Sequence, residues 1–199
     1  VYQQVITSLP ELDPAELALM HYYTSSLTEL GLADASYLEV QDRQAATCGG
    51  INAFSSIRGD VDNEQTSRGF FVLSSKALVR NQLQQSQLMR DTLGTVRFDE
   101  LDRLRELVSQ TRARREQSVT GNGHGLAMAA ACAGMSPVAR LNHELSGLAG
   151  IRSCKALDDS LENKDALQQF ADGLAGMHQK ILAMPRQFLT IAEQEHIPR

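Results

Sequence analysis

The sequence predicts an α+β fold in which a mostly antiparallel sheet packs against several helices. Three observations support this prediction. Short runs rich in β-forming residues occur at the start of the chain, as a pair in its first half, and near its end. The segments between them repeat apolar residues at helical spacing. Strands do not alternate regularly with helices, so a doubly wound parallel sheet is not expected.

The first thirty residues predict a strand followed by a helix. VYQQVI at 1–6 is short and rich in β-forming residues. Asp13 and Glu16 form a capping box around Pro14, which suits the first turn of a helix. Apolar residues then recur at helical spacing until Gly31, which is expected to end the helix.

A second helix and a β-hairpin are expected next. Ser36 with Glu39 repeats the capping pattern and predicts a helix to about Ala46. After two glycines, INAFSSIRG at 51–59 and RGFFVLSS at 68–75 read as strands joined by a polar loop. The loop of roughly eight residues is longer than that of a tight hairpin.

Helices dominate the rest of the chain. The Gln-rich segment 81–93 predicts one helix, and Phe98 precedes a longer one whose alternating charges are typical of a solvated face. Ser136 with the following proline marks another helix start. Asn163 begins a last helix with a clear apolar period, carried by Leu167, Phe170, Leu174, Met177 and Ile181.

A closing strand is expected at 186–192, which completes the predicted organisation. We expect residues 1–199 to form a single α+β domain that is a piece of a longer multidomain chain. Residues 1–75 would hold a strand, two helices and the hairpin, and residues 76–199 would be mainly helical with the closing strand.

Composition excludes several classes of protein. The formal net charge of −5 argues against a general nucleic-acid binder, which needs a basic face. Cys48, Cys132 and Cys154 are widely spaced and form no CxxC pair, which favours free thiols in a reducing compartment. The longest nearly apolar run, 125–135, is too short to span a bilayer, and no signal peptide is visible. We therefore expect no membrane partner and an intracellular location, in the cytoplasm or an organellar matrix.

The stretch TGNGHGLAM at 120–128 resembles a glycine-rich phosphate loop but fails the test. A dinucleotide fingerprint needs a third glycine at position 126, where this chain has Leu126, and it needs a preceding strand. Walker A also fails, because no Gly-Lys-Ser/Thr follows. A break between two helices is the better interpretation, with a small-residue helix after it that packs closely on a neighbour.

No catalytic or metal-binding constellation is evident. HELSG at 143–147 lacks the second histidine of HExxH, because Gly147 occupies its position. His21 has neither a glutamate nor a second histidine at ligand spacing, and we expect it to be a partly buried residue on a helix flank. His124, His178 and His196 have no ligand partners at suitable spacing. Cys48 is expected to be a buried structural thiol.

Taken together, two segments resemble the insulinase/pitrilysin-like zinc metallopeptidases. SYLEVQDRQAATCGGINAF is similar to their helix, Gly-Gly and strand passage. The run from RFDELDRL to LSGLAGI resembles the presequence-protease branch, and GLAGMHQKIL resembles a stretch near the end of the same region. The matching residues of the run are Gly123, His124, Leu126, Ala127, Met128, Ser136, Pro137, Glu144, Gly147 and Leu148.

The resemblance implies a non-catalytic third domain, at the start of the C-terminal half of such a protease. Proteins of this branch enclose a chamber that degrades short unstructured peptides, and zinc is bound by HxxEH in their first domain. The first helix here, LALMHYYTSSLTELG, stands where an active domain would carry that motif. No family ligand therefore transfers, so no catalytic, metal or cofactor residue is expected in this chain. The residues that contact peptide are not indicated.

Three hypotheses follow. The first is a domain that helps to form the peptide chamber of a zinc metalloendopeptidase and has no activity alone; its partners would be the N-terminal half of the parent and short peptides. The second is a catalytically inactive scaffold or assembly protein on the same fold. The third, a nucleotide-binding enzyme, depends on the failed glycine motif.

Overall fold

The computed structural model describes residues 1–196, and the contacts within it divide the chain into two units. The first, which we name the sheet unit, comprises Val1–Ser56, Phe70–Glu100 and the chain from Leu174 onward. The second, the helical unit, comprises Ile57–Gly69 and Leu101–Gly173. The expectation of a single domain stays a prediction, and each unit is described separately below.

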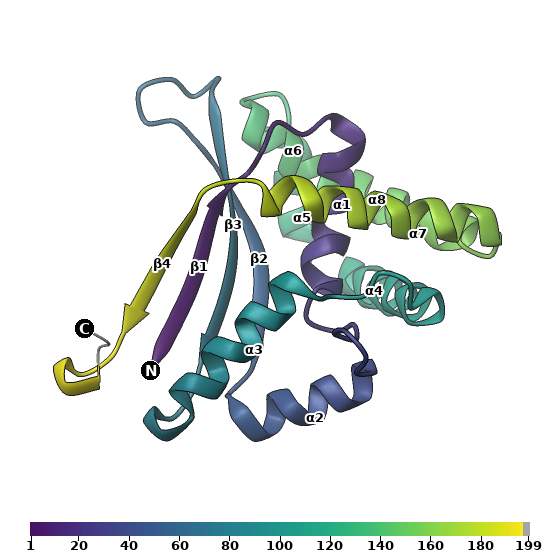
Figure 1. Cartoon of the computed structure of the whole chain (residues 1–199). Coiled ribbons are helices and arrows are strands. Elements are labelled where there is room, and N and C mark those ends of the chain that lie inside the picture. Colours follow the sequence, from purple (N-terminus) through teal and green to yellow (C-terminus); the bar gives the residue numbers. More distant parts are fainter. Residues whose placement is uncertain (197–199) are drawn as a thin grey trace. The chain divides into compact units, whose positions relative to one another are not determined.

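Four strands form one sheet with the order β2-β3-β1-β4 (Figure 1). They are β1 (Tyr2–Ser8), β2 (Ile51–Gly59), β3 (Ser67–Lys76) and β4 (Arg186–Ile191). β1 pairs antiparallel with both β3 and β4, so Val5 lies opposite Leu73 on one side and Phe188 on the other. The α+β class and the antiparallel sheet are therefore confirmed.

The predicted helix starts of the sheet unit are confirmed. Helix α1 (Pro14–Ser26) follows the capping box of Asp13 and Glu16, and α2 (Tyr37–Thr47) follows that of Ser36 and Glu39. These boxes satisfy backbone N–H groups that have no partner within a helix. A short 3-10 turn, η1 (Val79–Asn81), leads into α3 (Gln82–Gly94).

The end of α1 differs from its prediction, because the helix stops at Ser26 rather than near Gly31. Residues 27–30 form turns in which Leu27 and Leu30 are still fully buried. The apolar period continues through these turns because their side chains pack into the same core. Gly31 has a different role: a Cβ there would meet the Ala35 carbonyl oxygen at 2.5 Å.

The two faces of the sheet differ in what covers them. Val5, Phe71 and Leu73 point to the side of the helices and are buried with Tyr23 and Leu88. Side chains on alternate positions point to the opposite face, because successive residues of a strand alternate. That opposite face, which we name the open face, is the starting point for the functional site.

The helical unit is built from α4 (Leu101–Gly121), α5 (Gly123–Cys132), α6 (Pro137–Ser146) and α7 (Leu148–Ser160). Helix α8 (Lys164–Leu182) contributes residues to both units, and a 3-10 turn, η2 (Gln194–His196), follows β4. The predicted start of α6 is confirmed, since the Ser136 hydroxyl accepts a hydrogen bond from the Ala139 N–H. The five periodic apolar residues of α8 are all buried.

The break between α6 and α7 was not predicted as a helix boundary. The chain turns at Gly147, where a Cβ would meet the His143 carbonyl oxygen at 2.7 Å. Arg115 of α4 fastens this turn, because its guanidinium donates to the carbonyl oxygens of Leu145 at 2.9 Å and Gly150 at 3.2 Å. A charged side chain of α4 thus stabilises a helix end distant in sequence.

Candidate functional site

The open face of the sheet unit gathers exposed apolar side chains with almost no charge. The register places Tyr2, Ile191 and Leu189 on this face, with exposed fractions of 59%, 57% and 42%. Phe70 of β3 shares it, and Phe54 of β2 lies at the alternating position. Lys76 is the one charged side chain that this face carries within the described part of the sheet unit.

A shallow depression of about 190 Å³ lies on this face. Its lining includes neutral amides and hydroxyls, contributed by Gln4, Asn52 and Ser74, next to the ring of Tyr2 and to Lys76. Such groups can donate and accept hydrogen bonds, while the neighbouring aromatic rings offer apolar contact. This mixture suits an uncharged backbone with varied side chains better than one highly charged ligand.

Helix α1 presents aromatic and apolar side chains where a zinc site would need histidines. Met20 and Tyr23 are buried, whereas His21 is exposed and stacks edge-on against Tyr22 at 5.7 Å. The expectation of a partly buried His21 is thus not met, because the helix turns its ring outward. A zinc-activating site needs clustered imidazole and carboxylate ligands, and these residues do not fit one.

Tyr23 and His178 form a buried polar pair that sequence spacing did not reveal. The Tyr23 hydroxyl lies 2.9 Å from His178 Nδ1, although the residues are 155 positions apart. Burial lowers the pKa of His178, and a hydrogen bond to the backbone of Leu93 opposes that effect. Burial also raises the pKa of Tyr23. The ring is therefore neutral, and Nδ1 accepts the tyrosine proton while the other nitrogen donates to Leu93.

The Tyr23–His178 pair lies inside an aromatic cluster rather than at a surface. Ring centroids of Phe71 and Phe98 lie 5.7 and 6.3 Å from that of Tyr23. Nearby on α1 and α8, Lys180 donates to Glu16, which lowers the pKa of that exposed carboxyl. The geometry assigns the Tyr23–His178 pair to the core of the sheet unit, where no substrate atom reaches it.

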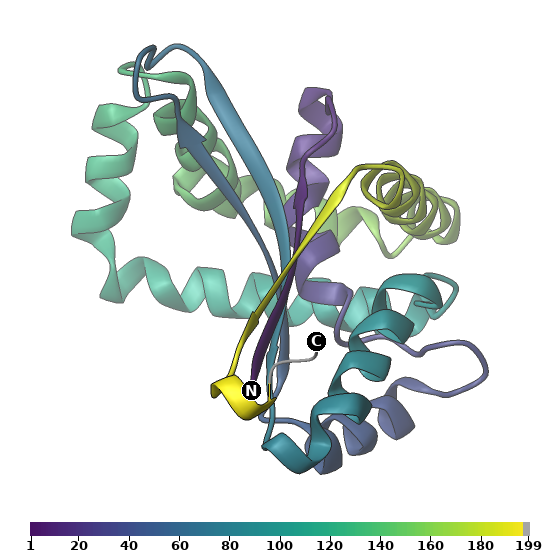
Figure 2. The same cartoon turned by 60° about the vertical axis from the view of Figure 1, so that its left-hand side comes forward.

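The glycine-histidine stretch is a joint between helices, as the sequence predicts. Figure 2 shows the chain turning sharply from α4 into α5, and the boundary falls at Asn122. The second part of that prediction, close packing of α5 on a neighbour, holds for Leu126 alone, the one buried residue of this helix. Met128 remains 54% exposed and His124 is also exposed.

HELSG and the cysteines do not assemble a catalytic site. Gly147 is needed for the tight approach to His143, so a second histidine there would clash with the backbone. Cys48 ends α2 and is half-buried, in contrast to the buried thiol that was expected, and its sulfur lies 3.4 Å from the Gln44 carbonyl oxygen. Cys132 and Cys154 are also free thiols.

One group of possible metal ligands was missed in the sequence, where His196 was judged to lack partners. Glu193, Glu195 and His196 place ligand atoms within 4.8 Å of one another. They are neighbours on an exposed turn, and His196 already pairs with Glu195 at 3.2 Å. Exposed acidic groups of this kind are common without an ion. No helix of residues 1–196 is both long and apolar enough to cross a membrane.

The fold and the open face define a peptidase-like α+β domain whose helix α1 lacks the ligands for zinc. The chain belongs to the family of domains described as associated with peptidase family M16, subfamily C, whose model matches residues 1–157. This membership confirms the resemblance to the presequence-protease branch noted in the sequence.

Known proteins similar to this chain support the same family. It is 26% identical over 165 residues to Presequence protease 1, chloroplastic/mitochondrial, of Arabidopsis thaliana, covering 81% of this chain and 15% of that protein. It is 27% identical over 165 residues to the mitochondrial presequence protease of Danio rerio, covering 82% and 16%. The chain thus spans only about a sixth of the length of these relatives.

A solved structure shares the fold at low identity. A conserved protein from Enterococcus faecalis V583 superposes with a TM-score of 0.62 at 12% identity, covering 94% of this chain and 42% of that one. At this identity the likeness concerns the fold alone.

Proposed function

We propose that this chain is a non-catalytic domain of a zinc-dependent metalloendopeptidase, and that its open face forms part of the wall of a peptide chamber. The observation that carries the proposal is the open face itself, which is rich in exposed apolar side chains and has one charged residue within the described sheet unit. Family membership and the similarity to presequence proteases support the same conclusion.

The proposed role is to confine a peptide rather than to cut it. Exposed rings such as those of Tyr2 and Phe70 hold apolar side chains of a peptide, while neutral amides such as that of Gln4 can pair with its backbone. Weak contacts spread over a surface select flexible chains without demanding one sequence. Zinc and the water that it activates belong to another domain of the parent, together with the N-terminal half that would close the chamber.

The location of the protein is part of the same proposal. The relatives carry chloroplast and mitochondrial names. We extend to this chain an intracellular site, in the cytoplasm or an organellar matrix.

The experiment compares this chain with a longer polypeptide that contains it. We expect the longer protein to cleave unstructured fluorogenic peptides in a zinc-dependent way, and the chain alone to cleave nothing. Replacing Tyr2 and Ile191 together by Ser should raise KM several-fold with little change in kcat. The matched control is Leu38→Ser, which removes an apolar side chain that is 58% exposed on α2.

Two results would contradict the proposal. Peptide cleavage by the chain alone, with about one zinc bound per molecule, would make this an active domain. A longer protein without peptidase activity would instead favour the inactive scaffold on the same fold.

A further inference from the structure

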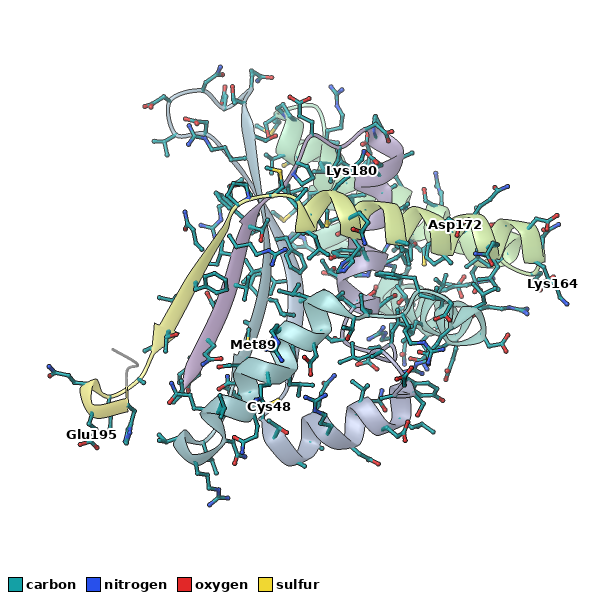
Figure 3. All side chains as sticks on the ribbon, in the orientation of Figure 1. Cys48, Met89, Lys164, Asp172, Lys180 and Glu195 are labelled. Carbon is teal, nitrogen blue, oxygen red and sulfur yellow. The ribbon has the colours of Figure 1, made fainter. Side chains whose placement is uncertain are left out.

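A groove of about 570 Å³ runs beside β4, on the side of the sheet that faces α3. Its apolar lining comes from Val5, Met89, Leu93, Leu182 and Phe188; Figure 3 labels Met89 on α3. Phe188 points toward the helix side yet is 77% exposed. The groove therefore leaves a large aromatic ring uncovered within a single unit of the chain, and its volume falls in the range of ligand-binding sites.

β4 is also an edge of the sheet. It pairs with β1 on one side, and within residues 1–196 no strand pairs with its other side. The N–H and C=O groups on that side are available to another extended chain. Side chains of a strand added there would alternate, and every second one would point to the same face as Phe188.

The charge of the groove is positive. Arg90 and Arg186 line it, and the described lining contains no aspartate or glutamate. Arg186 donates to the Leu182 carbonyl oxygen at 2.8 Å, which orients its guanidinium and leaves other N–H donors. Against the net charge of −5 for the whole chain, this groove is a local site for a carboxylate.

We propose that β4 and this groove bind an extended peptide by strand addition, with apolar side chains beside Phe188 and Met89 and a carboxylate at Arg186. A free edge and a side-chain groove next to it act together only on an extended chain. The inference rests on the proposed function, because it names a second peptide-contact surface, on the opposite face of the sheet from the chamber wall.

The test measures binding to the chain alone by fluorescence anisotropy. The probe is a labelled peptide in which Thr alternates with Leu, Phe and one Glu, so that all three larger side chains share one face. A second probe has the same sequence with methyl groups on alternate backbone nitrogens, which removes the donors needed for strand pairing. We expect the first probe to bind and the methylated one to bind at least about tenfold more weakly.

Gly94→Leu blocks the groove without disturbing the core. Gly94 lines the groove, and a Cβ at this position meets no atom within 4 Å. The matched control is Gly176→Leu in α8, where a Cβ also meets no atom within 4 Å. We expect Gly94→Leu to weaken binding about tenfold and Gly176→Leu to leave it unchanged.

Arg186→Gln tests the carboxylate contact. We expect it to weaken binding of the Glu-containing probe about threefold, a size typical of an exposed ion pair, and to have no effect on a probe with Gln in place of Glu. Arg105→Gln on α4 removes an exposed arginine of the helical unit and is the control for net charge.

Equal binding by the methylated probe, or by Gly94→Leu, would overturn the inference. A chain that sediments as a dimer, and as a monomer after Gly94→Leu, would assign the groove to a second copy instead. The proposed function would survive either result, because it is tested by zinc-dependent cleavage and by the Tyr2 and Ile191 replacements.

Discussion

The hydroxyl of Tyr23 offers the sharpest test of the core described above. Tyr23→Phe removes one oxygen and keeps the ring, which remains packed against Phe71 and Phe98. The change leaves His178 Nδ1 without its partner at a residue that is only 4% exposed. A buried acceptor that loses its donor destabilises a protein more than the bond itself contributes.

The expected destabilisation follows from these two terms. A net hydrogen bond contributes about 1 kcal/mol, and an unsatisfied buried group costs about 1–3 kcal/mol. Because Nδ1 stays partly polarised by neighbouring rings, we expect the free energy of unfolding to fall by about 2 kcal/mol. For a chain of this length the melting temperature should fall by about 4–8 °C.

The assay is denaturant unfolding followed by circular dichroism, with calorimetry for the melting temperature. Tyr2→Phe is the control, because it makes the same chemical change at a tyrosine that is 59% exposed. Nitrogen-15 NMR of the histidine ring reports the tautomer directly, and we expect the proton on Nε2. A proton on Nδ1, or a Tyr23→Phe protein as stable as the control, would refute the reasoning.

Three further outcomes are expected. Gln85→Met should stabilise the protein by about 1–2 kcal/mol, because the fully buried amide of Gln85 has no partner among the described residues; an unchanged unfolding midpoint would contradict this. Gly147→Ala should destabilise it by about 1–3 kcal/mol, because the new Cβ meets the His143 carbonyl oxygen at 2.7 Å, whereas Gly121→Ala, with open space around its Cβ, should not. Stability should fall as pH drops below about 6.5, since the unfolded chain then binds a proton that buried, neutral His178 resists because its pKa is lowered; His178→Gln should flatten this slope in urea titrations.

Local sequence patterns determined the elements of this protein. The capping boxes at Asp13 and Ser36 located the starts of α1 and α2, because the groups that satisfy a helix end lie within three residues of it. The apolar period of α8 and the hairpin were equally readable. The break at Gly147 was missed because a close approach to His143 leaves no period or cap in the sequence.

The resemblance in the sequence indicated the family, and the missing ligands in α1 indicated a domain without its own zinc chemistry. Neither showed which surface would meet a peptide. Strand alternation could have suggested an apolar face, but only the register joined Tyr2 to Ile191 and left Phe188 beside an open groove.

The chain by itself therefore determined its helices, its strands and its family, because these depend on residues close together or on motifs in order. The tertiary structure alone decided the pair of Tyr23 with His178, the open face and the edge at β4. Each of these depends on residues far apart in the sequence, and packing brings them together by burying apolar surface that no local pattern records.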